Sequence, residues 1–270
     1  AMRSKFFAVA SFSIIALFLL IGSIQPAAAE ADFRFSCADQ IYQAFGEELF
    51  TAFTKKTGLE PEIYTCSSST AMERLMNDYA DLASSTKKLY YRHQDYGYNE
   101  IVFGKDPLVI ITNEQVEVDS LSAEQIREIF GGKVENWKEV GGGDHLVATM
   151  VPGQHTGAYW NFRTKFMEGQ DIRYDFMSYE STKVIRSAMY YPYVISFITR
   201  AAISDYEHIK ILKVDNTSPD ALTYPYHQTF SFVTKGKAEG GPKAFIDFVT
   251  QGKGREILKE RGVTLMVDKK

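Results

Sequence analysis

Three short polar segments of the chain contain the residue types that hold an oxyanion without a metal. Each follows a strand-like run and precedes a helical pattern; the segments are Ser36-Cys37-Ala38, Ser67-Ser68-Ser69-Thr70 and Gly153-Gln154-His155-Thr156-Gly157. A helix N-terminus presents unpaired N–H groups and a partial positive charge, and hydroxyl groups add further donors. In a parallel sheet, such junctions lie at the carboxyl ends of the strands, where ligands bind. Together the segments predict an anion site, although any one of them alone fits a simple helix cap.

The sequence offers little for catalysis. Its five histidines are scattered, with no H-E-x-x-H motif and no pair four residues apart that could bind zinc. No G-x-S-x-G motif of an esterase is present, and the glycine run Gly141-Gly142-Gly143 lacks the G-K-(S/T) of a P-loop. We therefore expect a protein that is not an enzyme and that uses neither a metal nor another cofactor.

The chain has two cysteines, Cys37 and Cys66, and each ends a short strand-like run. A helical segment separates the two runs, and in a βαβ unit the ends of both strands can be neighbours. A disulfide between Cys37 and Cys66 is therefore sterically possible in an oxidising compartment. Two free, buried thiols are the alternative, because sequence does not fix the separation of the Cα atoms.

Strand and helix patterns alternate along the chain and would position these segments. Residues 40–57 carry apolar side chains at three-to-four spacing, which predicts an amphipathic helix that Gly58 ends. Residues 33–37 and 101–112 have the composition of strands. Strands that alternate with helices predict an α/β fold with parallel strands and helices on both faces of the sheet.

Residues 121–142, LSAEQIREIFGGKVENWKEVGG, carry the strongest local signal. Ser122 can cap a helix, and Gln125 three positions later completes a capping box. Apolar residues at helical spacing follow, and a Gly-Gly pair ends the pattern where a left-handed residue is needed. The segment predicts a surface helix followed by an exposed Trp137 and a glycine-rich turn.

The order of residues in this segment closely resembles L-(S/T)-x-x-Q-(I/L)-x-x-I-F-x-G-K-(I/V)-x-N-W-x-E-V-G-G of the phosphate-binding-protein-like solute receptors. That family contains periplasmic two-lobed proteins that deliver oxyanions to ABC importers. The similarity extends over nearly all of the mature chain, including residues 78–89 and 103–113. It implies an α/β, two-lobed periplasmic binding protein fold in which each lobe is a mixed sheet flanked by helices and two crossover strands form the hinge. Lobe one would comprise residues 30–112 and 223–270, and lobe two residues 113–222.

The first 29 residues predict a signal peptide. Arg3 and Lys5 precede an uncharged apolar run, and Ala27-Ala28-Ala29 resembles a cleavage site. A membrane anchor is the alternative, because the run approaches the roughly 20 residues that span a bilayer. We expect a periplasmic or otherwise exported protein.

The resemblance implies that the protein captures a small ligand between its lobes for the membrane permease of an ABC importer. The ligand would be an oxyanion such as a phosphate-like ion, sulfate, molybdate or tungstate. The alternative is the same fold used as a non-transport ligand sensor or partner-binding protein, with a small organic ligand. A formal net charge of −4 argues against nucleic acid as a partner, and we expect a monomer.

The ligand loops depart from the family pattern. Thr86 stands where the family has an Asp that accepts the hydrogen of protonated phosphate, and the third loop lacks the family's Arg. These departures favour a fully deprotonated oxyanion or an organic ligand, for which tyrosines near the hinge could form an aromatic wall. The candidate ligand-binding residues are Ser36, Cys37, Ser68, Ser69, Thr70, Thr86, Lys87, His155, Thr156, Gly157 and Tyr191.

Overall fold

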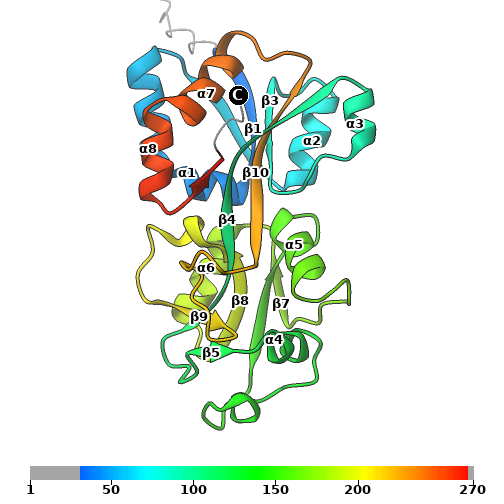
Figure 1. Cartoon of the computed structure of the whole chain (residues 1–270), viewed down its shortest axis with the longest axis vertical. Helices are drawn as coiled ribbons and strands as arrows, with labels where there is room; N and C mark the ends of the chain where they lie inside the picture. Colours follow the sequence, from blue (N-terminus) through cyan, green and yellow to red (C-terminus); the bar gives the residue numbers. More distant parts are fainter. Residues whose placement is uncertain (1–30, 267–270) are drawn as a thin grey trace, which may run out of the picture. The chain divides into compact units, whose positions relative to one another are not determined.

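The computed structural model describes residues 31–266 (Figure 1). The predicted signal peptide, residues 1–29, lies outside the described residues. The chain from Ala31 onward forms a single unit by the contacts among its elements. Within the described range, no helix combines the length and the apolar character that crossing a membrane requires.

The first sheet is mixed and contains, in spatial order, β2 (Pro61–Cys66), β1 (Phe33–Ala38), β3 (Leu82–Ser85), β10 (His227–Lys235) and β4 (Tyr98–Asn113). β1 is parallel to β2 and β3, whereas β10 is antiparallel to β3 and β4. Parallel neighbours need a crossover connection, which the helices α1 (Asp39–Thr57) and α2 (Ser68–Met76) supply. The short β11 (Thr264–Leu265) also pairs with β4.

The second sheet begins on the same strand β4. Its other strands are β5 (Ser120–Leu121), β6 (Ala148–Pro152), β7 (Phe176–Ser178), β8 (Val194–Thr199) and β9 (Ile209–Val214). β4 pairs antiparallel with β8 and β9, and β6 is parallel to β8 and β7. We call the elements around the first sheet lobe one and those around the second sheet lobe two. The predicted mixed sheets are therefore present.

The strand β4 is shared by both lobes (Figure 1). Its first part, up to Pro107, pairs with β10, and its residues from Leu108 onward pair with β8. The pairing places the passage between the sheets near Pro107, a few residues before the expected boundary at 112 and 113. The division into residues 30–112, 113–222 and 223–270 stays a proposal.

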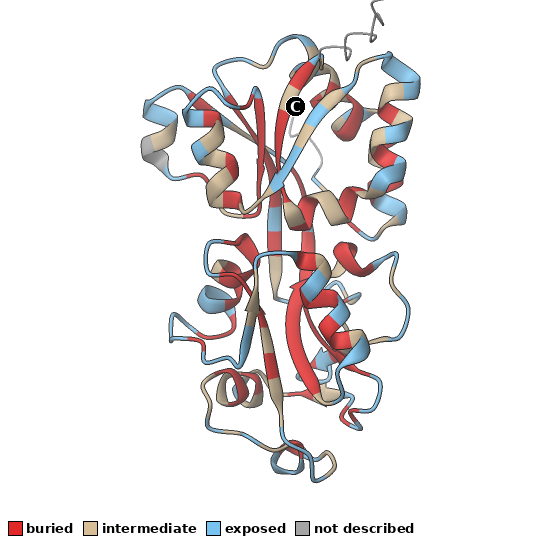
Figure 2. Ribbon diagram, turned by 180° about the vertical axis from the view of Figure 1, so that it is seen from behind, coloured by how far each residue is buried: buried red, intermediate tan, exposed pale blue. Residues whose placement is uncertain are grey.

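Helices cover both sheets, and the strands β1, β3, β8 and β10 are mostly buried (Figure 2). Lobe one also has α3 (Tyr91–Asp95), α7 (Gly240–Gln251) and α8 (Lys253–Glu260). Lobe two has α4 (Ala123–Phe130), α5 (Gly157–Lys165), α6 (Ser181–Tyr190) and the 3-10 helices η1 (Trp137–Val140) and η2 (Arg200–Ile203).

The core of lobe one is rich in phenylalanine: the rings of Phe103 and Phe232 stack with centroids 4.4 Å apart. The phenylalanine rings of lobe one therefore serve packing.

The segment at residues 121–142 folds largely as predicted. The Ser122 hydroxyl accepts a hydrogen bond from the Gln125 N–H at 3.0 Å, and the Gln125 side chain accepts one from the Ser122 N–H at 2.9 Å. Gly132 has the left-handed φ of 71°. The expectation that Trp137 is exposed is wrong. Trp137 is 1% exposed, because η1 folds back onto the core of lobe two and the indole N–H donates to the Tyr193 carbonyl at 3.0 Å.

Of the two alternatives for the cysteines, the structure has the free thiols at Cys37 and Cys66 and no disulfide between them. Strands β1 and β2 do lie side by side, but their register pairs Cys66 with Ala38 and Cys37 with Thr65. Successive side chains of a strand point to opposite faces of the sheet, so the two sulfur atoms are on opposite sides. Cys37 lies in the core under α1, and Cys66 packs beside α2. Burial raises the pKa of the Cys37 thiol, and it raises that of Cys66 to about 12.

Candidate functional site

A small cavity lies where the N-termini of α1, α2, α5 and α6 converge. It is lined by Ala38, Asp39, Gln40, Cys66, Ser67, Ser68, Thr86, Thr156, Gly157 and Ser181. Two of these helices belong to lobe one and two to lobe two, so the cavity lies between the lobes. Its free space is about 10 Å³, which is roughly the room that one water molecule needs.

Hydroxyl caps leave N–H groups of α2 and α5 for a ligand. Ser67 caps α2 by accepting from the Thr70 N–H at 3.1 Å, and Thr156 caps α5 by accepting from the Tyr159 N–H at 3.2 Å. Each cap satisfies the third N–H of its helix, whereas the first two N–H groups have no partner inside the helix. Both helix ends therefore direct donors and partial positive charge at the cavity.

The two lobes approach closely at this point. The Asn161 amide donates to the carbonyl oxygens of Thr86 and Gly157, each at 2.8 Å, and so bridges the lobes. A Cβ atom placed on Gly157 would lie 1.5 Å from the Thr86 Oγ1 atom. Position 157 consequently requires glycine for this approach. Thr86 itself is fixed by its N–H, which donates to the Ser68 hydroxyl at 3.2 Å.

Asp39 is the one charged side chain among the described residues that line the cavity. Its Oδ2 atom accepts a hydrogen bond from the Ser181 N–H at 2.6 Å, which places a carboxylate of lobe one on the N-terminus of α6 in lobe two. The neighbouring Gln40 is 4% exposed. Its Oε1 atom accepts from Gln228 at 2.7 Å, whereas no described residue pairs with its Nε2 atom.

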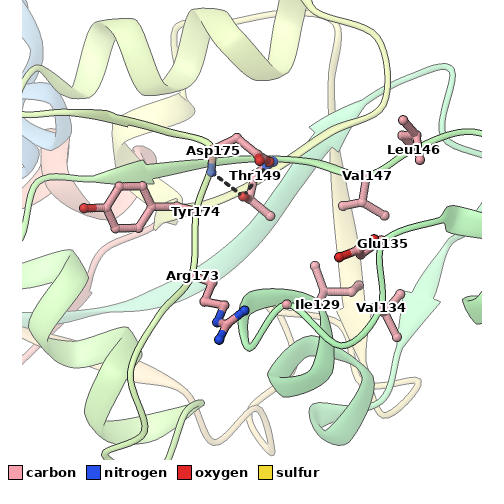
Figure 3. A pocket seen from close by; sticks show the side chains of 10 residues that line it. Ile129, Val134, Glu135, Leu146, Val147, Thr149, Arg173, Tyr174 and Asp175 are labelled. Carbon is pink, nitrogen blue, oxygen red and sulfur yellow. Dashed lines mark hydrogen bonds between the residues drawn. The ribbon is translucent and has the colours of Figure 1, made fainter.

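A second, larger pocket lies elsewhere in lobe two, beside α4 and β6 (Figure 3). Asp175 and Thr149 on its wall bond to each other: the Asp175 Oδ2 atom accepts from the Thr149 N–H at 2.8 Å and from its hydroxyl at 2.9 Å. No helix N-terminus contributes to the residues that line it, so it lacks the donors that converge between the lobes. The interlobe cavity is the candidate site.

A family model described as the PBP superfamily domain matches residues 25–253, which is most of the chain. The chain belongs to the PBP superfamily. The family resemblance predicted from the sequence is thereby confirmed, and so is the two-lobed α/β fold.

Individual PBP relatives agree with this assignment. The phosphate-binding protein PstS of Borreliella burgdorferi is 28% identical over 211 residues, which cover 72% of this chain and 76% of that protein. An ABC transporter substrate-binding protein from Clostridium perfringens, solved with bound phosphate, has a TM-score of 0.76 at 22% identity and covers 87% of this chain and 99% of its own. An ABC-type phosphate transport receptor from Vibrio cholerae has a TM-score of 0.67 at 18% identity, covering 87% and 100%. These two structures share the fold.

Four of the residues predicted to bind a ligand line the cavity of this PBP: Ser68, Thr86, Thr156 and Gly157. Four more lie next to it. The Ser69 hydroxyl donates to the His155 carbonyl at 3.3 Å and accepts from the Lys87 ammonium at 2.9 Å. Thr70 bonds to the α2 cap through its N–H. Desolvation lowers the pKa of Lys87, which is half-buried.

Three predicted residues lie away from the cavity. The Ser36 hydroxyl accepts from the Arg74 guanidinium at 2.9 Å, and Cys37 is in the core on the other face of the sheet. Tyr191 is 64% exposed and does not line the cavity. The other tyrosines near the hinge are also absent from the lining: Tyr190, Tyr193, Tyr224 and Tyr226. Tyr224 is buried, and its hydroxyl donates to the Leu108 carbonyl at 2.8 Å.

The sequence analysis missed Asp39, Gln40 and Ser181. A signal for Ser181 was present, because Glu180-Ser181-Thr182 is a fourth polar junction ahead of a helical pattern. Asp39 and Gln40 directly follow the first junction, where the strand ends one residue later than expected. No signal in the sequence indicated that the side chain of Asp39 reaches the other lobe.

Proposed function

We propose that this PBP captures a small oxyanion, with phosphate first among the candidates, between its two lobes and delivers it to the permease of an ABC importer. The observation that carries the proposal is the convergence of four helix N-termini on one cavity. Each helix end is equivalent to a partial positive charge of roughly half a unit, and the ends of α2 and α5 also offer N–H donors without a partner inside the helix. The Borreliella relative is named a phosphate-binding protein, and the Clostridium neighbour holds phosphate.

Hydroxyl groups supply the remaining donors. The hydroxyl oxygen atoms of Ser68 and Thr86 are 3.4 Å apart, and both residues line the cavity. No lysine, arginine or histidine is among the described residues that line it. The anion would therefore be held by neutral donors and helix ends, an arrangement that needs no metal.

Closure of the lobes would couple binding to transport. Contacts between the lobes surround the cavity: Asn161 reaches Thr86, Ser69 reaches His155, and Ser181 reaches Asp39. A ligand that bonds to both lobes stabilises the arrangement in which these contacts form, and a permease can recognise the resulting surface. We further propose that residues 1–29 are a signal peptide, that the exported chain is monomeric, and that it has no catalytic activity.

A thermal-shift screen with phosphate, sulfate, molybdate and tungstate tests this function. A bound oxyanion at 100 times its dissociation constant should stabilise the protein by about 2.7 kcal/mol. Ser68→Ala removes a hydroxyl from the cavity and should weaken binding about tenfold, because hydrogen bonds to charged groups contribute roughly 1.5–3 kcal/mol.

Thr51→Ala is the matched control, because it also removes a hydroxyl, and Thr51 is exposed on α1 and does not line the cavity. It should affect affinity less than Ser68→Ala. Unfolding temperatures that no oxyanion raises would overturn the proposed function.

A further inference from the structure

We propose that this protein has a second ligand site beside the interlobe cavity and that the second site binds a small aromatic anion, such as an aromatic carboxylate. The site is a separate pocket of about 350 Å³, which shares no lining residue with the interlobe cavity. Ligand pockets commonly measure roughly 300–1,000 Å³ and often lie between domains. The pocket is lined by Lys87, Lys88, Leu89, Tyr90, Gln94 and Trp160.

Both lobes contribute to this pocket. The loop 87–90 and α3 belong to lobe one, whereas Trp160 belongs to α5 of lobe two. The next residue of α5, Asn161, donates to the Thr86 carbonyl at 2.8 Å, which holds this part of α5 against the start of the loop. Thr86 lines the interlobe cavity, so the pocket adjoins it. A ligand in the pocket would contact both lobes, as the oxyanion would.

Hydrogen bonds hold the loop 87–90 in place. The Ser85 hydroxyl accepts from the Lys87 N–H at 3.0 Å and donates to the Lys87 carbonyl at 2.8 Å. The Leu89 N–H donates to the Glu100 carboxylate at 3.3 Å, and the Leu89 side chain is buried. Contacts within lobe one therefore position this wall of the pocket, which lowers the entropic cost of binding a ligand.

The charges on the wall favour an anion. Lys87 and Lys88 are the only charged side chains among the described residues that line the pocket, whereas Glu73 lines a neighbouring pocket beside α2. The half-buried Lys87 donates to the Ser69 hydroxyl at 2.9 Å, and no described carboxylate forms an ion pair with either lysine. A half-buried ammonium group without a counter-ion is costly, and a carboxylate in the pocket would pair with it.

Aromatic and apolar side chains supply most of the remaining wall. Leu89 is buried, Trp160 is half-buried and Tyr90 is 62% exposed. A planar ligand ring gains more from such a wall than an aliphatic chain of the same size, because aromatic pairs prefer stacked or edge-to-face contacts. The ligand should therefore combine an aromatic ring with a negative charge.

Titration calorimetry of benzoate and its neutral isostere benzamide at neutral pH tests this inference. Wild type should bind benzoate about tenfold more tightly than benzamide, because charge-assisted hydrogen bonds are the stronger ones. Lys88→Glu reverses a charge on the pocket wall and should weaken benzoate binding about tenfold, with little effect on benzamide. The matched control Lys237→Glu makes the same charge change at an exposed residue of lobe one outside the pocket and should match wild type.

Tryptophan fluorescence gives a second readout of the location. The other tryptophan of the chain, Trp137, is 1% exposed in the core of lobe two, so bound benzoate should change the emission of Trp160 alone. Trp160→Leu should abolish this change and should weaken the binding of benzoate and benzamide alike. Saturating phosphate should leave benzoate bound to wild type, because the two ligands occupy different sites.

Wild type that binds neither benzoate nor benzamide would overturn the second site, and equal affinity for both would overturn its preference for an anion. Displacement of benzoate by phosphate would show that both ligands use the interlobe cavity, which also overturns the second site. These three results need no variant to fold. Unchanged benzoate affinity in Lys88→Glu and Trp160→Leu would overturn the location. The oxyanion screen tests the proposed function separately, since benzoate binding does not require phosphate to bind.

Discussion

At the scale of single residues, one carboxyl group lies in the interior and does not line the interlobe cavity. Asp106 is fully buried on β4, one residue before the passage between the sheets at Pro107. Its Oδ2 atom accepts from the Thr199 hydroxyl and from the Ala201 N–H, whereas no described residue pairs with Oδ1. Desolvation raises the pKa of Asp106 to about 7, and these two hydrogen bonds limit the rise.

The titration of Asp106 predicts a pH dependence of stability. The pKa of Asp106 is higher in the folded than in the unfolded chain. Its contribution to the free energy of unfolding is therefore fully present below about pH 4 and is lost as pH rises toward 7. Because of this group, the free energy of unfolding should fall by up to roughly 1.4 kcal/mol per pH unit. The free energy of unfolding can be measured with urea at pH 5 and at pH 7. Between these two pH values it should fall by about 2 kcal/mol more in wild type than in Asp106→Asn. Identical losses in both proteins would contradict the assignment.

At the scale of elements, the sequence predicts what local chemistry determines. Ser122 and Gln125 form the capping box, and Ser67 and Thr156 cap α2 and α5 because the signals lie within four residues of each other. Contacts that depend on the register of distant strands were not predictable. Asp39 meets Ser181 across 142 positions of the chain, and the cavity lining combines residues of both lobes.

The register of β1 and β2 predicts the redox state of the cysteines. Because Cys37 and Cys66 point to opposite faces of the sheet, the protein should have two thiols. Thiol titration of the protein purified without reductant, after denaturation, should find two reactive groups per chain. One disulfide per chain would show that the register differs from that described here.

At the scale of the whole molecule, the neighbouring strands β4 and β10 connect the lobes, and hydrogen bonds around the cavity hold the lobes together. β10 begins at His227, opposite Pro107 of β4, so both strands pass between the sheets at the same level. Bending at this level would open the cavity with little disturbance of either core, as in hinge closure around a ligand. The donors proposed to bind the ligand belong to both lobes, and we expect them to act together only when the lobes are closed.

Calorimetric titration of phosphate into wild type, Gly157→Ala and Gly143→Ala tests the central claim most directly. A methyl group at position 157 would meet the Thr86 hydroxyl at 1.5 Å and hold the α5 N-terminus away from lobe one. We predict that wild type binds phosphate and that Gly157→Ala binds at least tenfold more weakly. Gly143→Ala should match wild type, because its added methyl group would meet the exposed side chains of His145 at 3.1 Å and Glu117 at 3.5 Å, away from the cavity. Equal phosphate affinity in all three proteins would contradict an anion site between the helix N-termini.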